Sequence, residues 1–333
     1  MTILKGTPED ILQQAADMII SGGTLAIPTE TVYGLAADIT LPAAIRTIFE
    51  LKNRPLNHPL IVHIAKKEDI RVYANNIPDY VDALIEHFWP GPLTLILERS
   101  AKTGTWVTGG QDTVAIRMPS HPLTLTLINK VGHPLAAPSA NKFGRISPTC
   151  AEHVIDDFNG QLTVLDGGAC QLGIESTIVN AIQSHSLSVL RPGHISIENL
   201  QQALKHYPHV TIAEDSSSIR APGKMLKHYA PQKPVLLFSA QHQLDQYQER
   251  YQQQVYLLHY STNNFSSKFQ HKLSTTPGEF AKEMYHQLRI ADASAALAIA
   301  IECPPESPEW LYIYDRLKKS SATEKKGNST HHE

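Results

Sequence analysis

The sequence predicts an α/β protein with a mixed, largely antiparallel sheet, followed by a smaller α/β domain. Short apolar runs typical of buried strands alternate with helical patterns along the first two thirds of the chain. Several of these runs are joined by segments too short for a helical crossover, which favours antiparallel pairing. The chain has 333 residues, more than a typical single core needs, and its composition changes near residue 213. We therefore expect two domains.

The N-terminal region predicts helix, strand and helix. Thr7 is expected to cap a helix that begins at Pro8 and stops at two glycines. A short strand over 24–27 leads into a polar loop, and a second helix over 42–51 must end before Pro55. Further strands are expected at 60–64, 93–97, 113–118, 135–137, 163–165, 176–181 and 187–190, with helices near 80–87, 123–130, 149–157 and 197–206.

The C-terminal third predicts a linker and a small domain. Residues 213–234 are rich in Ser, Pro and Gly and are expected to connect a first domain, 1–212, to a second, 235–317. In the second domain, strands at 235–238 and 255–259, a polar helix between them, a helix from about 279 to 301 and a segment at 310–314 predict a Rossmann-like βαβ unit. Residues 318–333 are polar and are expected to be disordered.

Composition limits the classes of protein. Hydrophobic residues make up 42% and charged residues 18%, as in ordinary globular proteins, and no apolar stretch predicts a membrane span. Cys150, Cys170 and Cys303 are few and far apart, and acids interrupt any N-terminal apolar segment, so we expect a cytoplasmic protein. The 17 histidines show no zinc-finger or HExxH spacing.

Charge gives a mixed indication about anionic partners. The net charge of −3 is not that of a protein that binds nucleic acid over its whole surface. Between Arg99 and Arg145, however, there are six Lys/Arg and only Asp112 opposing them. This segment is either a solvated basic face or part of a groove for a polyanion.

Polar side chains gather where predicted strands meet loops. The segments are PTETVYGLAAD (28–38), KNRPLNHPLIVHI (52–64), TVAIRMP (113–119), SANKFGRISPT (139–149), GIESTIV (173–179) and LRPG (190–193). Each polar residue has an ordinary structural explanation: Ser147 can cap a helix, Arg117 can form a surface ion pair, and His63 can be a core imidazole. One shared ligand explains all of them more simply. A triphosphate needs such cations, hydroxyls and backbone donors. P-loop, dinucleotide and α/β-hydrolase signatures are absent.

These segments, in this order, resemble the YrdC-like family in the long two-domain form of L-threonylcarbamoyladenylate synthases. APGKMLKHYAP (221–231) resembles the linker motif of that form. The resemblance implies a twisted open sheet with a concave cavity. It also implies that L-threonine, bicarbonate or CO₂ and ATP are joined into threonylcarbamoyl-AMP with release of pyrophosphate. The product serves modification of the adenosine beside the anticodon of tRNA.

The resemblance assigns site residues motif by motif. Lys52 and Arg54 are expected to act on the departing pyrophosphate together with Mg²⁺, which enters with ATP rather than on protein ligands. Thr31, His63, Arg117, Ala137 and Ser176 are expected to bind L-threonine. Lys52, Arg54, His58, Thr113, Ser139, Asn141, Ser147, Arg191 and Tyr229 are expected to bind ATP, with Tyr229 and His228 folding over the nucleotide as a lid.

Two positions depart from the family pattern. His58 stands where many members have Asn, and the linker string GKMLKHYAP differs from the more usual one while keeping His228-Tyr229. Glu30 or Glu175 can either assist a proton or Mg²⁺, or cap a turn.

Other functions remain open from the sequence. One alternative is an RNA-binding module without catalysis; the absence of an aromatic stacking stripe counts against it. Another is a related carbamoyl-adenylate enzyme, although the extra cysteine-rich regions of that type are missing. Expected partners are the three substrates and a downstream tRNA threonylcarbamoyl transferase, with weak contact to tRNA possible and no membrane contact.

Overall fold

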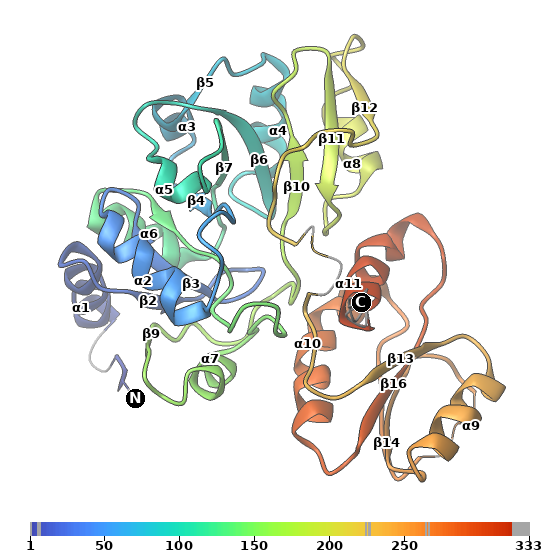
Figure 1. The fold of residues 1–333 in the computed structure, drawn as a ribbon. Helices are drawn as coiled ribbons and strands as arrows, with labels where there is room; N and C mark the ends of the chain where they lie inside the picture. Colours follow the sequence, from blue (N-terminus) through green and yellow to red (C-terminus); the bar gives the residue numbers. More distant parts are fainter. Residues whose placement is uncertain are drawn as a thin grey trace, which may run out of the picture.

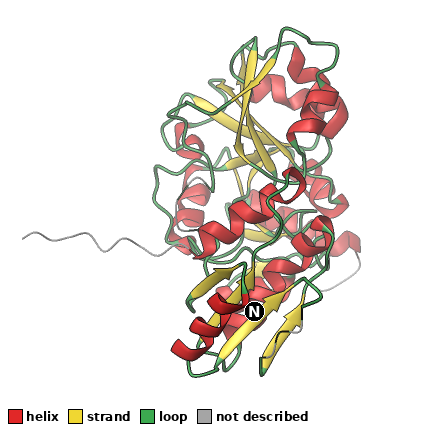
Figure 2. Cartoon of the chain, turned by 90° about the vertical axis from the view of Figure 1, so that its right-hand side faces the viewer, coloured by secondary structure: helices red, strands yellow, loops and turns green. Residues whose placement is uncertain are grey.

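The computed structural model describes residues 2–4, 8–223, 225, 228–263, 265 and 267–321. Two bodies, each with its own sheet, are connected by the linker (Figure 1). In the side view of Figure 2, the strands of the small sheet lie at the lower end and those of the large sheet lie above them. The predicted N-cap Thr7 lies outside the described residues.

The first body contains most of the predicted elements. Its helices are α1 (Pro8–Ile20), α2 (Pro42–Lys52), α3 (Ile70–Tyr73), α4 (Tyr80–Phe88), α5 (Thr105–Thr108), α6 (Pro122–Val131), α7 (Ala151–Asp157) and α8 (Ile197–Ala203). Its strands are β1 (Thr2–Ile3), β2 (Leu25–Ile27), β3 (Gly34–Asp38), β4 (Ile61–His63), β5 (Ala74–Asn75), β6 (Leu93–Arg99), β7 (Thr113–Arg117), β8 (Leu135–Ala136), β9 (Thr163–Val164), β10 (Thr177–Asn180), β11 (Ser186–Arg191) and β12 (Thr211–Ala213).

These strands form one 12-stranded mixed sheet. Its order is β1-β9-β2-β3-β8-β4-β7-β6-β10-β11-β12, with β5 paired to β6. Antiparallel pairs such as β6–β7 slightly outnumber parallel pairs such as β4–β7. The predicted α/β class with a mixed sheet is confirmed.

Strand β3 is an element that the sequence did not predict. All five of its residues are buried, so the strand shows no alternation of polar and apolar side chains. Leu35 and Ala37 pack with α2, whereas Ala36 packs with α1 on the other face. Because β3 is covered on both faces, its sequence is a continuous apolar run without alternation. This run directly follows the polar loop that begins at Pro28.

The second body is a small parallel α/β domain, as predicted. Its strands, in the order β13-β16-β14-β15, are β13 (Val235–Phe238), β16 (Ala298–Glu302), β14 (Val255–His259) and β15 (Phe269–Lys272). Its helices are α9 (Gln241–Arg250), α10 (Pro277–Ala293) and α11 (Leu311–Ser321).

Two predictions for this body were wrong. The helix expected to reach 301 ends at Ala293, and residues 298–302 form the buried strand β16 between β13 and β14. In the segment at 310–314, Trp310 ends a short 3₁₀ helix and residues 311–314 begin helix α11. That helix continues to Ser321 with Leu317 and Ser320 buried, so the disordered tail does not begin at 318. In both cases, strand pairing and side-chain packing within the domain outweigh the preference of the local sequence. Residues 322–333 lie outside the described part.

None of the described helices is both long and apolar enough to cross a membrane.

The two bodies share a core at their junction. Val32, Ile146 and Ile174 of the first body pack in one cluster with side chains of α10 and α11. Beside this cluster, Arg289 of α10 forms an ion pair with Asp157 of α7 at 2.7 Å. Helix α10 is therefore fixed against the loops that carry the predicted motifs.

Gly173 lies close to the backbone of α10, and its replacement tests this junction. It has a φ of +69°, and a Cβ there would lie 2.4 Å from the carbonyl oxygen of Lys282 on α10. We expect Gly173→Ala to lower the free energy of unfolding by about 2–4 kcal/mol, because backbone strain adds to overpacking. Urea denaturation measures this change.

Gly132→Ala is the matched control. Gly132 has a φ of +80° with no neighbour within 4 Å, so it reports backbone strain alone, about 1 kcal/mol. Equal losses in both variants would contradict the tight contact.

Candidate active site

A small cavity collects many of the predicted donors. It lies among residues of β4, β7 and β11, the loops before β3 and β10, the segments after α2 and β8, and the linker, and its volume is about 50 Å³. The predicted residues that line it are Thr31, Arg54, His63, Arg117, Ala137, Ser139, Ser176, Arg191 and Tyr229. Lys52, His58, Thr113, Asn141 and Ser147 are not among its lining residues.

Arg117 lies at the end of β7 with its guanidinium group buried. One Nη donates to Thr31 Oγ1 at 2.9 Å and Nε donates to the Gly91 carbonyl at 3.3 Å. The other Nη lies 2.6 Å from Glu30 Oε1, too poorly aligned for a hydrogen bond but close enough for an ion pair. Glu30 also accepts from the Ser120 N–H, so its carboxylate orients Arg117 and is not a free base.

His63 is a neutral imidazole beside Arg117. Burial and then the Arg117 charge lower the pKa of His63 to about 3. Its Nδ1 donates to the Ile61 carbonyl at 3.1 Å. The neighbouring Ala137 uses its own N–H on the same Ile61 carbonyl. His63 therefore adds a polar but uncharged wall to the cavity.

Lys52 supports the loop that carries Ser139. It is the last residue of α2 and is buried, and its Nζ donates to the carbonyl oxygens of Ser139 and Asn141 at 2.5 and 2.6 Å. Burial, then the Arg54 charge, holds its pKa well below the usual value. The Asn141 side chain donates to the carbonyl groups of Lys142 and Arg145 and so also shapes this loop.

Arg54 and His58 both contact the aromatic ring of Phe143. The Arg54 guanidinium is 5.4 Å from the Phe143 ring centre and donates to the Pro59 carbonyl at 2.8 Å. Burial lowers the pKa of Arg54 to about 10, so it stays charged at neutral pH. His58 packs edge-on against Phe143, and burial followed by the charges of Arg54 and Arg220 lowers its pKa.

Thr113 lies at the other end of β7 from Arg117. The two share a strand face, about 13 Å apart along the strand. Ala115 on the same face packs in one cluster with Ala221 of the linker. Thr113 therefore lies on the covered face of β7, beyond the present cavity.

Arg191 connects the sheet to the linker. Its Nε and one Nη donate to the carbonyl and hydroxyl oxygens of Ser176, and its other Nη donates to the Pro222 carbonyl at 3.3 Å. Ser176 also shares a hydrogen bond of 2.7 Å with Thr94. Both predicted residues are thus held rigidly in the cavity wall.

Glu175 and Ser147 belong to a buried network that includes the second body. The Glu175 carboxylate accepts from Ser147 Oγ, from Tyr285 Oη at 3.1 Å and from Arg316 Nε at 2.9 Å. Burial alone would raise the pKa of Glu175, but Arg316, then Arg191 and Ser147, lower it to about 2. Glu175 is therefore ionised and fully engaged, which favours a structural role.

The linker closes the cavity. Pro222, Gly223, His228 and Tyr229 all line it. Burial lowers the pKa of His228 to about 3, so its imidazole is neutral. Tyr229 is buried between the cavity and the second body: its ring stacks on Tyr285 at 5.9 Å, and Arg316 lies 5.1 Å over it.

Sequence reasoning missed Tyr285 and Arg316 as contributors to this site. Both come from helices of the second body, and no motif marks them. Only the packing of α10 and α11 against the loops of the first body brings them to Glu175 and Tyr229.

Gly223→Ala tests how tightly the linker fits. A Cβ there would lie 2.4 Å from the Tyr229 hydroxyl and 2.9 Å from Arg191 Cδ. We expect the variant to displace Tyr229 and to increase its modification by tetranitromethane, mapped by mass spectrometry. Gly110→Ala has a similar positive φ with no neighbour within 4 Å and is the control. Unchanged protection of Tyr229 in Gly223→Ala would contradict the contact.

Two larger hollows, of about 830 and 660 Å³, carry none of the predicted donors. The small cavity is therefore the candidate active site. Buried arginines at the strand ends of an α/β sheet, covered by an interdomain linker, define a protein that binds an anionic small molecule.

Comparisons with known proteins give the family. A family model described as "Telomere recombination" matches residues 17–193, and one described as "Threonylcarbamoyl-AMP synthase, C-terminal domain" matches residues 195–322. A threonylcarbamoyl-AMP synthase of Pyrococcus abyssi is 35% identical over 96% of this chain and 98% of its own length. One of Schizosaccharomyces pombe is 36% identical over 92% and 86%. The chain belongs to the threonylcarbamoyl-AMP synthase family, in its two-domain form.

Solved structures agree with this assignment. The crystal structure of P. abyssi Sua5 complexed with L-threonine has 34% identity and a TM-score of 0.85, covering 96% of both chains. E. coli YciO, at 19% identity and a TM-score of 0.50 over 57% of this chain and 91% of its own, shares the fold of the first body.

Proposed function

We propose that this chain is a nucleotidyltransferase that makes threonylcarbamoyl-AMP and pyrophosphate from L-threonine, bicarbonate or CO₂, and ATP. The observation that carries the proposal is the convergence of Arg54, Arg117 and Arg191 on one buried cavity. Its relatives are named for this reaction product, and the similar P. abyssi protein was solved with L-threonine.

Arg117 is the proposed anchor for the threonine carboxylate. Its planar guanidinium matches two carboxylate oxygens, and it is already oriented by Thr31 and Glu30. His63, Ala137 and Ser176 surround the same space. Because His63 is neutral, it can contact the ammonium or hydroxyl side of the substrate without charge repulsion.

ATP binding is proposed to require movement of the linker. The cavity of about 50 Å³ has room for one or two water molecules, whereas a nucleotide needs several hundred cubic ångströms. Residues 222–223 and 228–229 line the cavity, and Ala221 packs in one cluster with Ala115, which lies between Arg117 and Thr113 on β7. Opening the linker would expose Thr113 and bring Arg54, Ser139 and Arg191 within reach of the triphosphate, with Lys52, His58, Asn141 and Ser147 behind them.

The proposed chemistry needs no nucleophile from the protein. The threonine amine adds to CO₂ to form a carbamate, losing a proton, and a carbamate oxygen attacks the α-phosphorus of ATP while pyrophosphate leaves. The chain's task is to position the two substrates and to neutralise charge with Lys52 and Arg54. Closure of the linker over the nucleotide, with Tyr229 and His228, keeps water from the unstable carbamate.

Mg²⁺ does not fit the carboxylates of this chain near the cavity. Glu30 is paired with Arg117, and Glu175 is engaged by Arg316, Tyr285 and Ser147. We propose that Mg²⁺ is held by the phosphate oxygens of ATP, where it neutralises their charge.

A pyrophosphate assay tests the proposed reaction. Purified chain with L-threonine, bicarbonate, ATP and Mg²⁺ is expected to release pyrophosphate and to form a product with the mass of threonylcarbamoyl-AMP. L-serine is the matched control, because it lacks only the threonine methyl group, and is expected to react more slowly. If no pyrophosphate is released when L-threonine, bicarbonate, ATP and Mg²⁺ are all present, the proposal is contradicted.

The proposed product also implies a partner enzyme, and the cysteines bear on the cellular location. An acyl-phosphate mixed anhydride of this kind hydrolyses easily, so an enzyme that transfers the threonylcarbamoyl group to tRNA is expected to take it up directly. The scattered cysteines support a reducing, cytoplasmic location.

A further inference from the structure

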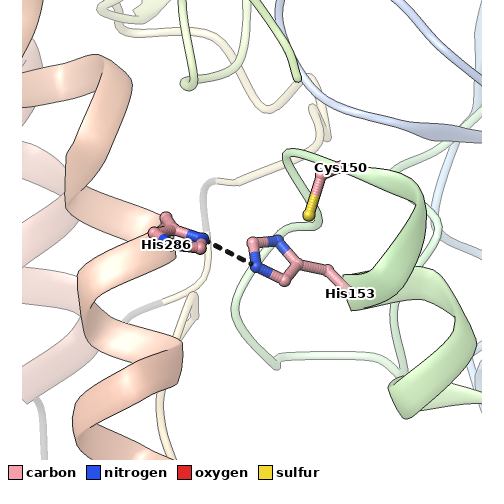
Figure 3. Close-up of side chains that lie close together, drawn as sticks. All are labelled: Cys150, His153 and His286. Carbon is pink, nitrogen blue, oxygen red and sulfur yellow. Dashed lines mark hydrogen bonds between the residues drawn. The ribbon is translucent and has the colours of Figure 1, made fainter. Parts of the chain in front are cut away.

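A second cluster of chemically reactive side chains lies at the junction of the two bodies. Cys150 precedes α7, His153 lies in its first turn, and His286 comes from α10 on the other side (Figure 3). His153 Nε2 and His286 Nδ1 are 3.1 Å apart. One ligand atom from each of the three residues lies within 4.8 Å of the other two.

These distances are close to those of a metal site. In a tetrahedral Zn²⁺ site with bonds of about 2.0–2.3 Å, neighbouring ligand atoms are about 3.3–3.8 Å apart. The two histidine nitrogens, 3.1 Å apart, lie slightly closer together than that spacing, and a small rotation of the exposed His286 side chain would reach it. Cys150 and the exposed His286 need only side-chain rotation to complete it, because neither is fully buried.

The chemistry of the three side chains also selects the metal. One thiolate and two imidazoles are the ligands that Zn²⁺ takes in proteins. His153 Nδ1 accepts the Thr149 N–H, so that nitrogen carries no proton and the imidazole is neutral, as a ligand must be. The Arg289 charge is itself paired with Asp157 at 2.7 Å, which weakens its repulsion of a cation.

Thr149 contacts the ring nitrogen of His153 that does not face the cluster. Its hydroxyl oxygen lies 3.3 Å from His153 Nδ1, and its backbone N–H donates to the same nitrogen at 3.1 Å. With a metal on Nε2, the imidazole proton moves to Nδ1 and is donated to the Thr149 hydroxyl, as outer partners of metal-bound histidines commonly arrange. The Thr149 N–H loses its acceptor in this exchange, which is a cost of binding.

We propose that Cys150, His153 and His286 bind one Zn²⁺ that clamps α7 to α10. Binding releases the thiol proton of Cys150 to solvent and leaves the fourth coordination position for water. That position opens to the hollow of about 830 Å³, which Cys150 and His286 line. None of the residues lining this hollow lines the catalytic cavity, so the clamp acts on the junction of the bodies and not on the substrates.

The test uses the full chain, stripped with a chelator and titrated with ZnCl₂ or CoCl₂. We expect one metal per chain, a thiolate-to-Co²⁺ charge-transfer absorption, and a rise of several degrees in Tm with Zn²⁺. Cys150→Ala is expected to abolish the absorption, and His286→Ala to weaken binding at least 10-fold. His286 is exposed, so its replacement is expected to leave the fold intact.

Matched controls are Cys303→Ala and His242→Ala, which remove the same side-chain types in the second body away from the cluster. Both are expected to bind as the unchanged chain does. The proposal is overturned if the chain binds no metal, or if binding and the Tm rise persist in Cys150→Ala and His286→Ala. In the first case, the His153–His286 contact is only a hydrogen bond between the bodies.

Discussion

Replacing Arg117 by lysine is expected to lower kcat/KM for L-threonine by about 100-fold or more. Removing one partner of a buried, hydrogen-bonded charge pair typically costs 2–5 kcal/mol of binding, and 1.4 kcal/mol is a factor of ten. Lysine keeps the charge, but it cannot contact Thr31, Glu30 and a substrate carboxylate together as the guanidinium can. The loss is expected mainly in KM for threonine, measured by pyrophosphate release at saturating ATP.

Arg71→Lys is the matched control for this substitution. Arg71 is an exposed arginine that pairs with Asp82 on the surface, and its replacement is expected to leave kcat/KM unchanged. Thermal unfolding shows whether Arg117→Lys is folded. A folded Arg117→Lys variant with the kcat/KM of the unchanged chain would contradict the proposal that Arg117 binds the threonine carboxylate.

Arg316→Met is expected to destabilise the chain by about 3–5 kcal/mol. The side chain of Arg316 is fully buried and reaches from α11 to Glu175 and to the Pro192 carbonyl in the first body. Methionine leaves the Glu175 carboxylate buried without its cation, and breaking a buried ion pair in this way carries that cost. Urea denaturation at neutral pH measures the change.

A double variant separates the interaction between Arg316 and Glu175 from the other effects of the substitutions. Adding Glu175→Gln to Arg316→Met removes the uncompensated charge and is expected to recover part of the lost stability. Arg250→Met, at an exposed arginine of α9, is expected to stay within 0.5 kcal/mol of the unchanged chain. Strict additivity of the two single changes would show that Arg316 and Glu175 do not interact.

The same pair predicts how stability depends on pH. Because the pKa of Glu175 is lowered from 4.5 to about 2 in the folded chain, its stabilisation is complete above pH 4.5 and is lost as the pH falls towards 2. The full effect is of order 3 kcal/mol at 1.36 kcal/mol per pKa unit. Arg316→Met is expected to lose less stability than the unchanged chain over this range, in denaturation measured at pH 5, 4 and 3. An equal loss would contradict the role of Arg316.

The candidate site was predictable because polar groups leave a local mark. Thr31, Arg117 and Ser176 stand in motifs that interrupt apolar runs, and the structure places all three at one cavity. Lys52 was recognised by the same signal, yet its side chain points to the loop of Ser139. A motif shows that a residue matters, but it does not show which neighbour the side chain contacts.

The sequence by itself determined the α/β class, the linker between two domains and most of the donors of the cavity, since periodicity and polar motifs are properties of nearby residues. Strands β3 and β16, helix α11 and the reach of Tyr285 and Arg316 into the site were decided only by the tertiary structure. Each of these depends on contacts between segments far apart in the chain. Burial on both faces and long-range ion pairs carry no period that a short window can detect.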